Sequence, residues 1–428
     1  MIEHRHASDV GRLCDLVDRH PVEAALHEQA GGYVGYRLTG RQALAGSPIH
    51  TTIIHSLHTD IYLVHNRAVS SLGAFSWLRQ PQCSSAVPAS PVLRPPTGST
   101  IEGETIDVLT RMGLANAVRA KALPSRSFAF KDADDVTLGT VGAGGDQASH
   151  ERYEIHRDDL LDILFGAVAD DVELLFGRSI DRLEEGTDTV SVTFNDGDRR
   201  DFALVFGCDG NRSNTRKLLF GEGEQFTHFM GGYFFLKVVP QTGLLAANVS
   251  EVFSVPGRMA MLNGYDDRTD IGFGFRTEGE IDYDYRDRAQ QRRLIHERFG
   301  GLGWKVPAML AGSDGDDDFY FDRINQISMP CWSRGRVALV GDAGYCVSPL
   351  AGFGGSMAII GAGRLVAALE RYPSDHVAAF RHYEDGLRPF VEEVQERAAS
   401  DGMAMMCPAD EGELAERDQK IAAGDIGF

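Results

Sequence analysis

The most informative segment of the chain reads Arg336-Val337-Ala338-Leu339-Val340-Gly341-Asp342-Ala343-Gly344-Tyr345 and continues as Ser348-Pro349-Leu350-Ala351-Gly352-Phe353-Gly354-Gly355-Ser356. The apolar run Val337 to Val340 predicts a short strand buried on both faces. The glycines after Pro349 predict a loop with few side chains, followed by a helix. Such a loop presents unpaired N–H groups at the positive end of the helix dipole, which can hold an anionic or electron-rich group. A strand–turn–helix with packing glycines would carry the same residues, so this segment alone leaves both interpretations open.

The spacing of this segment resembles the second FAD-binding motif of the single-component aromatic hydroxylases, the flavoproteins similar to para-hydroxybenzoate hydroxylase and tetracycline monooxygenase. That motif reads Gly-Asp-Ala, then Pro-x-x-Gly-x-Gly and a helix, and this chain matches it, with Tyr345 where most members carry His and Ser356 where many carry Asn. The resemblance implies that the cofactor-binding residues here are Gly341, Asp342, Pro349, Ala351, Gly352, Phe353, Gly354, Gly355 and Ser356.

Two further matches extend the resemblance. The run from Gly207 to Arg216 is similar to the family's Gly-x-Asp-Gly-x-x-Ser-x-x-Arg motif, which serves both FAD and the reduced nicotinamide. The resemblance implies that Asp209 and Gly210 contact the cofactor. It also implies that Arg157, directly before a predicted helix, contacts the flavin. A turn at the end of a strand and a surface arginine are the alternatives at these two places.

The first hundred residues differ from the rest of the chain. They hold 7 acids and 8 arginines, eight of the 14 histidines and no lysine. The family resemblance implies a strand, Gly-x-Gly-x-x-Gly and a helix here, but no such pattern occurs. We therefore expect residues 1–92 to be an anomalous segment in which the N-terminal βαβ unit is missing or corrupted, by a frame error, a wrong start or degeneration. The histidines could also be taken as a metal site, but their spacing fits no ligand template.

Composition narrows the class of protein. The chain has 428 residues, 43% of them hydrophobic, and a net charge of −20, which disfavours nucleic acid and anionic membranes as partners. Its six cysteines form no C-x-x-C pair, which argues against zinc or a disulfide framework and indicates a cytoplasmic protein. No segment approaches the ~20 apolar residues of a membrane span.

We predict an α/β fold: a FAD-binding, Rossmann-like domain of the glutathione-reductase type, an inserted antiparallel-sheet substrate domain, and a C-terminal helix. The predicted boundaries are 93–222 and 320–372 for the FAD-binding domain, 223–319 for the aromatic-rich middle domain, and 373–428 for the helix and tail. An apolar stripe predicts the last long helix: Phe380, Tyr383, Leu387, Val391, Val394 and Ala398. Residues after Asp410 are expected to fray.

The resemblance implies a FAD-dependent monooxygenase that uses NAD(P)H and O2 to hydroxylate a small aromatic or polyketide-like molecule through a flavin hydroperoxide. No catalytic acid or base can be named from the sequence. Two alternatives stay open: a flavin fold used for a non-redox rearrangement or cyclisation, and a flavin-free pseudoenzyme, which the absent phosphate loop favours. The sequence says nothing of the oligomeric state or of which nicotinamide is used.

Overall fold

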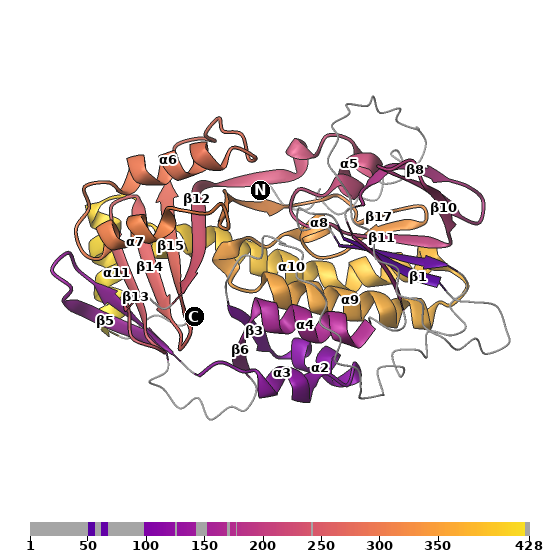
Figure 1. Ribbon diagram of the computed structural model, residues 1–428. Coiled ribbons are helices and arrows are strands. Elements are labelled where there is room, and N and C mark those ends of the chain that lie inside the picture. Colours follow the sequence, from indigo (N-terminus) through magenta and orange to yellow (C-terminus); the bar gives the residue numbers. More distant parts are fainter. Residues whose placement is uncertain are drawn as a thin grey trace, which may run out of the picture.

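The computed structural model describes residues 50–55, 61–66, 98–124, 126–142, 152–168, 172–176, 178–240 and 243–423 (Figure 1). Most of the predicted anomalous segment, residues 1–92, lies outside these residues. The structure therefore does not test whether a glycine-rich βαβ unit is missing there, and it does not describe the side chains of the histidine cluster. The described part forms sheets of six, three, seven and two strands together with helices. The predicted α/β fold is thereby confirmed.

The six-stranded sheet carries the strand predicted from the motif. Its order is β17 (Ser333–Arg334), β18 (Val337–Leu339), β11 (Leu204–Cys208), β2 (Ile61–Asn66), β1 (His50–His55) and β7 (Glu173–Phe176). Central β11 is parallel to β18 and antiparallel to β2. Strands β11 and β18 are almost wholly buried, as their uninterrupted apolar sequences predict.

A three-stranded sheet stands beside it, formed by β8 (Ile180–Glu185), β9 (Val190–Phe194) and β10 (Arg199–Phe202). Gly197 makes the turn after β9 with a φ of 82°. The uninterrupted apolar run Phe202 to Phe206 predicts a single strand, but the structure has two. The run is divided at Ala203, because β10 pairs with β9 while β11 pairs with β18 in the six-stranded sheet.

A small α/β layer lies between the two large sheets (Figure 1). It consists of the antiparallel strands β3 (Gly98–Glu102) and β6 (Arg152–His156) and the helices α2 (Glu104–Arg111), α3 (Ala115–Ala120) and α4 (Arg157–Val168). Ile101, Leu109, Ile155 and Leu160 form its buried core. Gly113 follows the end of α2 in the left-handed region, with a φ of 75°.

The seven-stranded sheet is the predicted aromatic middle sheet. Its order is β16 (Tyr320–Ile327), β12 (Thr227–Pro240), β15 (Arg268–Arg276), β14 (Arg258–Gly264), β13 (Ser250–Val255), β4 (Ser127–Lys131) and β5 (Thr137–Gly142). All pairings are antiparallel except that of β13 with β4. Strands β4, β5 and β16 thus join this sheet from segments predicted to belong to the FAD-binding domain, and the domain boundaries stay a prediction.

One face of the seven-stranded sheet is covered by α6 (Arg288–Phe299) and α7 (Val306–Ser313) (Figure 1). The residues packed there are largely aromatic and include Tyr233, Phe235, Phe273, Phe275 and Phe299. Their rings lie 4.6 to 6.4 Å apart in tilted, stacked and edge-on pairs. Such burial of large side chains makes this face a core of the middle part of the molecule.

The C-terminal part comprises α8 (Asp342–Tyr345), the 3-10 turn η3 (Pro349–Ala351), α9 (Gly354–Arg371), α10 (His376–Met406) and α11 (Glu411–Ala423). The predicted stripe of α10 is buried along its whole length, with Pro389 inside the helix. The expectation that residues after Asp410 fray was wrong: Asp410 accepts hydrogen bonds from the backbone of Gly412 and Glu413, and Ile421 is buried against the seven-stranded sheet. None of the described helices combines the length and apolar composition needed to cross a membrane.

Candidate flavin site

The site begins where β18 ends. Gly341 follows with a φ of 67°, a conformation that favours glycine, and a Cβ there would lie 3.2 Å from the Ala358 Cβ of α9. The strand end and the helix therefore approach more closely than a side chain would allow. The backbone then turns directly into α8, whose first residue is Asp342.

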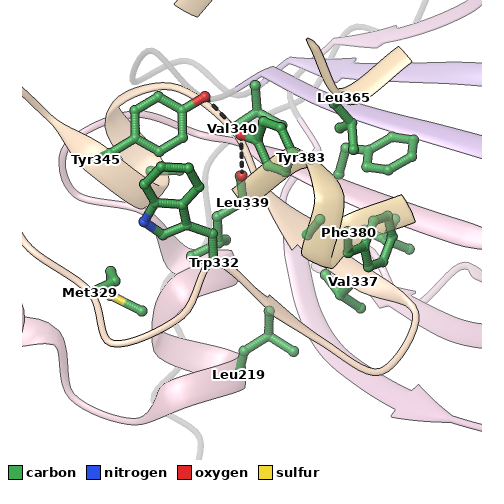
Figure 2. Packing of buried hydrophobic residues seen from close by; sticks show 14 of the residues in the cluster. Leu219, Met329, Trp332, Val337, Leu339, Val340, Tyr345, Leu365, Phe380 and Tyr383 are labelled. Atoms are coloured by element: carbon green, nitrogen blue, oxygen red, sulfur yellow. Dashed lines mark hydrogen bonds between the residues drawn. The ribbon is translucent and has the colours of Figure 1, made fainter. Parts of the chain in front are cut away.

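Behind this turn, Tyr345 is fully buried rather than available for catalysis (Figure 2). Its hydroxyl lies 2.8 Å from that of Tyr383, which donates to the Leu339 carbonyl at 3.1 Å. The Trp332 ring packs against Tyr345 at 4.4 Å. Burial raises the pKa of the neighbouring Cys346 thiol, so this side chain is not a ready nucleophile either.

The predicted glycine loop leaves the first turn of α9 bare. Ser348 and Gly352 both have positive φ, of 83° and 62°, and η3 lies between them. Gly352 and Gly355 are exposed, and a Cβ at Gly352 would meet nothing within 4 Å. The N-cap residue Phe353 makes no side-chain capping hydrogen bond. The leading N–H groups of α9 are thus left to an external acceptor.

Strand β3 forms the second wall of this loop. A Cβ at Gly355 would lie 3.4 Å from Ser99 Oγ, and the buried Ser356 hydroxyl donates to the Thr100 carbonyl. Sequence reasoning missed Ser99 and Thr100, because the preceding residues show no periodic pattern. The β-forming run Ser99-Thr100-Ile101 was the available signal, but only its pairing with β6 reveals its position.

Positive charge from two distant segments acts on Asp342. Burial raises the pKa of the Asp342 carboxyl, and the positive charge of Arg157 is the largest opposing influence, with Arg216 a further one. A Cβ at Gly354 would lie 4.0 Å from Asp342 Oδ1. A carboxylate and bare helix amides thus lie side by side under the influence of the Arg157 charge, which suits a ligand that carries both hydroxyl groups and an electron-rich ring.

The predicted Asp-Gly motif, Gly207 to Arg216, contacts α8 next to Asp342. Asp209 is fully buried and accepts hydrogen bonds from Ser213 Oγ at 2.5 Å and the Thr215 amide at 2.7 Å, at the start of α5 (Asn214–Phe220). Gly210 turns with a φ of 75°. Arg216 donates to the Ala343 carbonyl at 2.8 Å and so connects the motif to α8. The Asp209 carboxylate faces its own helix, and direct cofactor contact by Asp209 and Gly210 stays a prediction.

The remaining predicted residues lie at the rim. Pro349 and Ala351 form η3, and the Phe353 ring meets the Phe390 ring edge-on at 6.0 Å. Phe353 lines a surface hollow of about 550 Å³ together with Glu104 and Arg364, on the α10 side of the loop. Its side chain is therefore turned to α10. The described residues contain no group of His, Cys, Asp and Glu side chains that could hold a metal ion.

FAD fits the described part of this site. The glycine loop is open, the helix terminus it leads into lacks a cap, and Asp342 can accept hydrogen bonds from hydroxyl groups beside it. These are the features needed to hold an electron-rich ring and its sugar-like chain. The segment expected to grip the pyrophosphate lies outside the described residues.

Comparison with known proteins agrees with this geometry, although no protein-family model matches the chain. An uncharacterised protein of Mycobacterium tuberculosis is 36% identical over 345 residues, which cover 78% of this chain and 91% of the relative. A flavin-dependent monooxygenase from an unknown prokaryotic organism is 35% identical over 64% of this chain and 71% of its own length. The crystal structure of the tetracycline destructase Tet(51) superposes with a TM-score of 0.68 at 26% identity, covering 88% of this chain and 98% of that one. The chain belongs to the family of single-component FAD-dependent monooxygenases.

Proposed function

We propose that this FAD-dependent monooxygenase hydroxylates a small aromatic or polyketide-like molecule, with NAD(P)H as the reductant and O2 as the oxygen source. The uncapped, glycine-lined start of α9 beside Asp342 is the observation that carries the proposal. Bound FAD supplies the electron transfer and oxygen activation that no side chain of this chain can supply.

The chain's own residues hold and polarise the cofactor. The leading amides of α9 and the helix dipole stabilise negative charge on a ring placed against the loop. Asp342 accepts hydrogen bonds from hydroxyl groups, and Arg157 keeps positive charge beside it. Arg216 holds α8 in place through the Ala343 carbonyl.

A second apolar cluster of the seven-stranded sheet lies next to the same loop, where it would form a wall of the substrate pocket. On the side of the seven-stranded sheet opposite to α6 and α7, Phe130, Val252, Met259 and Ile324 cluster with residues of α10, and Leu350 of η3 packs against them. A surface of aromatic and methionine side chains suits a planar, water-poor ligand and keeps water from the reacting ring. The name of Tet(51), a tetracycline destructase, further supports a polycyclic substrate.

The nicotinamide and the compartment are inferred from the Asp-Gly motif and from the cysteines. The Asp-Gly motif implies a reduced nicotinamide by resemblance, without favouring NADH or NADPH. Within the described part of the chain Cys346 and Cys407 form no disulfide, which supports a reducing compartment such as the cytoplasm.

The first test is an absorption spectrum of the purified protein before and after addition of FAD. The second measures the oxidation of NADH or NADPH together with the consumption of O2 and the formation of hydrogen peroxide. We expect flavin bands and oxidation of one nicotinamide. A colourless protein that takes up no FAD contradicts the proposal and favours a pseudoenzyme. A flavin-bound protein that converts substrate without consuming nicotinamide favours a non-redox reaction.

A pair of variants locates the flavin. Gly354→Val places a branched side chain at the start of α9 beside Asp342, so we expect FAD affinity to fall about tenfold or more. Gly279→Val is the matched control, because a Cβ at Gly279 meets nothing within 4 Å and its φ is not positive. Equal FAD affinities of the two variants would place the ring elsewhere.

A further inference from the structure

A row of polar side chains crosses the substrate face of the seven-stranded sheet. Ser250 of β13 is paired with Asn263 of β14, and Asn263 with Asp270 of β15. Directly paired residues point to the same face of a sheet. Alternation along each strand sets this row on the same face as Val252 and Met261, and opposite to Ile271.

That face is the one turned to the flavin loop. Val252 and Met261 belong to the apolar cluster that includes Leu350 of η3 and Met403 of α10. Beside this cluster three buried polar residues lie in line across neighbouring strands. A sheet face used only for packing has no need of them.

The row is buried and incompletely paired. Ser250 is 0% exposed, Asn263 7% and Asp270 1%. Among the described residues, neither Ser250 Oγ nor Asn263 Oδ1 has a hydrogen-bond partner. Buried polar atoms are nearly always paired, so two such atoms side by side indicate a polar ligand group between them.

A buried cation closes one end of the row. Arg126 precedes β4, its side chain is 5% exposed, and its Nη2 donates to Glu154 at 2.8 Å. Its guanidinium lies 4.4 Å from the centre of the Tyr265 ring, and the Tyr265 hydroxyl donates to Asp270 at 3.2 Å. Arg126 Nη1 is buried without a hydrogen-bond partner in the described part of the chain. The row thus offers an unused donor as well as unused acceptors.

The cluster is also adjacent to the flavin site. The His156 ring lies 4.4 Å from the Tyr265 ring, and His156 directly precedes Arg157, whose charge acts on Asp342. Arg268, at the start of β15, lies 3.9 Å from Asp158 of α4. The polar row is thus connected to the start of α4, where Arg157 lies, through Tyr265 and His156 and through Arg268 and Asp158.

We propose that Arg126, Ser250, Asn263 and Asp270 form the subsite that recognises a hydroxyl-bearing ring, a phenol or an enol, of the substrate. The hydroxyl oxygen accepts a hydrogen bond from Arg126 Nη1, and its proton is donated to Asn263 Oδ1. A carbonyl beside the hydroxyl accepts from Ser250 Oγ. This inference rests on the proposed function and narrows its substrate class.

Asp270 adapts the subsite to the charge of the ligand. Burial raises the pKa of this carboxyl to about 7, against hydrogen bonds from Tyr265 and Asn263 and the positive charges of Arg126 and Arg268. Near neutral pH the carboxyl is therefore present in both protonation states. The neutral acid beside Arg126 tolerates a phenolate, and the carboxylate tolerates a neutral phenol.

The experiment compares two probes by equilibrium dialysis against the FAD-loaded full chain: alizarin, whose hydroxyl lies beside a ring carbonyl, and its dimethyl ether. We expect alizarin to bind at least about tenfold more tightly, since a site built for a hydroxyl rejects ligands that lack it. Asn263→Leu and the milder Ser250→Ala should each remove most of this preference while ether binding stays. Thr105→Val, which removes an equally buried and unpaired hydroxyl in α2, should leave the preference unchanged.

Equal binding of both probes, no binding of either, or a preference that survives Asn263→Leu and Ser250→Ala would each overturn the subsite. The flavin spectrum and nicotinamide oxidation of the same samples report separately on the proposed function. A sample that holds FAD and oxidises NAD(P)H but shows no preference refutes only the subsite. A sample that takes up no FAD refutes the proposed function itself.

Discussion

At the scale of single residues, the Tyr345 hydroxyl group occupies the space that a side chain at Gly361 of α9 would need. A Cβ at Gly361 would lie 2.0 Å from the Tyr345 hydroxyl oxygen and 3.1 Å from the ring carbon that carries it. Alanine is favoured over glycine inside a helix by up to about 1 kcal/mol, but this clash outweighs that gain. We expect Gly361→Ala to lower the free energy of unfolding by about 1–3 kcal/mol in denaturant titrations.

Two comparisons test the cause of that loss. Adding Tyr345→Phe, which removes the clashing oxygen, should recover part of the stability of Gly361→Ala. Gly166→Ala in α4, where a Cβ meets nothing within 4 Å, should instead be neutral or slightly stabilising. Loss of stability in Gly166→Ala to the same degree would refute the steric explanation.

The buried carboxyl of Asp270 predicts a pH dependence of folding. Its pKa rises from 3.8 to about 7, so between these values the folded state keeps a proton that the unfolded state releases. Stability therefore falls as pH rises through this window and is constant above it. At about 1.4 kcal/mol for each pH unit, the effect is on the order of 4 kcal/mol at most.

We expect Asp270→Asn, which cannot ionise, to gain stability relative to the wild type as the pH rises from about 4 to 7 in denaturant titrations. Parallel profiles of the two proteins would contradict it.

At the scale of elements, α11 is held by its contact with the seven-stranded sheet. Ile421 is buried, a Cβ at Gly139 of β5 would lie 2.6 Å from Ile421 Cγ2, and Arg417 donates to Ser254 of β13 at 2.8 Å. Shortening a buried isoleucine to alanine costs about 2–5 kcal/mol, which is more than a single terminal helix gains from its own hydrogen bonds. We expect Ile421→Ala to release α11, seen as faster amide exchange in α11 and β5 with α9 unchanged. Lys420→Ala, on the exposed side of α11, is the control and should change neither.

At the scale of the whole molecule, the Asp-Gly motif is tied to the seven-stranded sheet. Arg212 forms a two-pronged ion pair with Asp322 of β16, and Asn211 and Asn325 exchange amide hydrogen bonds of 2.7 and 2.8 Å. Asp322 is 8% exposed, whereas the Arg212 side chain is 41% exposed, so solvent screens part of the attraction. We expect Arg212→Ala to cost about 1–3 kcal/mol because it leaves a buried carboxylate short of partners.

A double-mutant cycle checks that link. Removing both Arg212 and Asp322 should cost less than the sum of the single losses, with a coupling of about 0.5–3 kcal/mol in denaturant titrations. Additive losses would show that the two segments are held by packing alone.

Local patterns predicted much of this molecule. The strand at Val337, the glycine loop, the α9 helix and the apolar stripe of α10 follow from short-range periodicity and backbone preferences. The predictions were wrong where contact with a distant segment determines the secondary structure. Residues after Asp410 are mostly polar, and only contact with the sheet makes Ile421 a core residue. The run from Phe202 to Phe206 is apolar throughout, and only pairing with two different sheets divides it.

By itself, the amino-acid sequence determined the family and the position of the flavin loop, because Gly341-Asp342 and the later glycines act through their own backbone geometry and need no distant residue to do so. Only the tertiary structure decided what surrounds that loop. Strand register aligned Ser250, Asn263 and Asp270, packing brought Arg126 to Tyr265, and the fold set the charge of Arg157 where it acts on Asp342. Contacts between segments more than a hundred residues apart depend on how whole sheets assemble, and no local pattern records that.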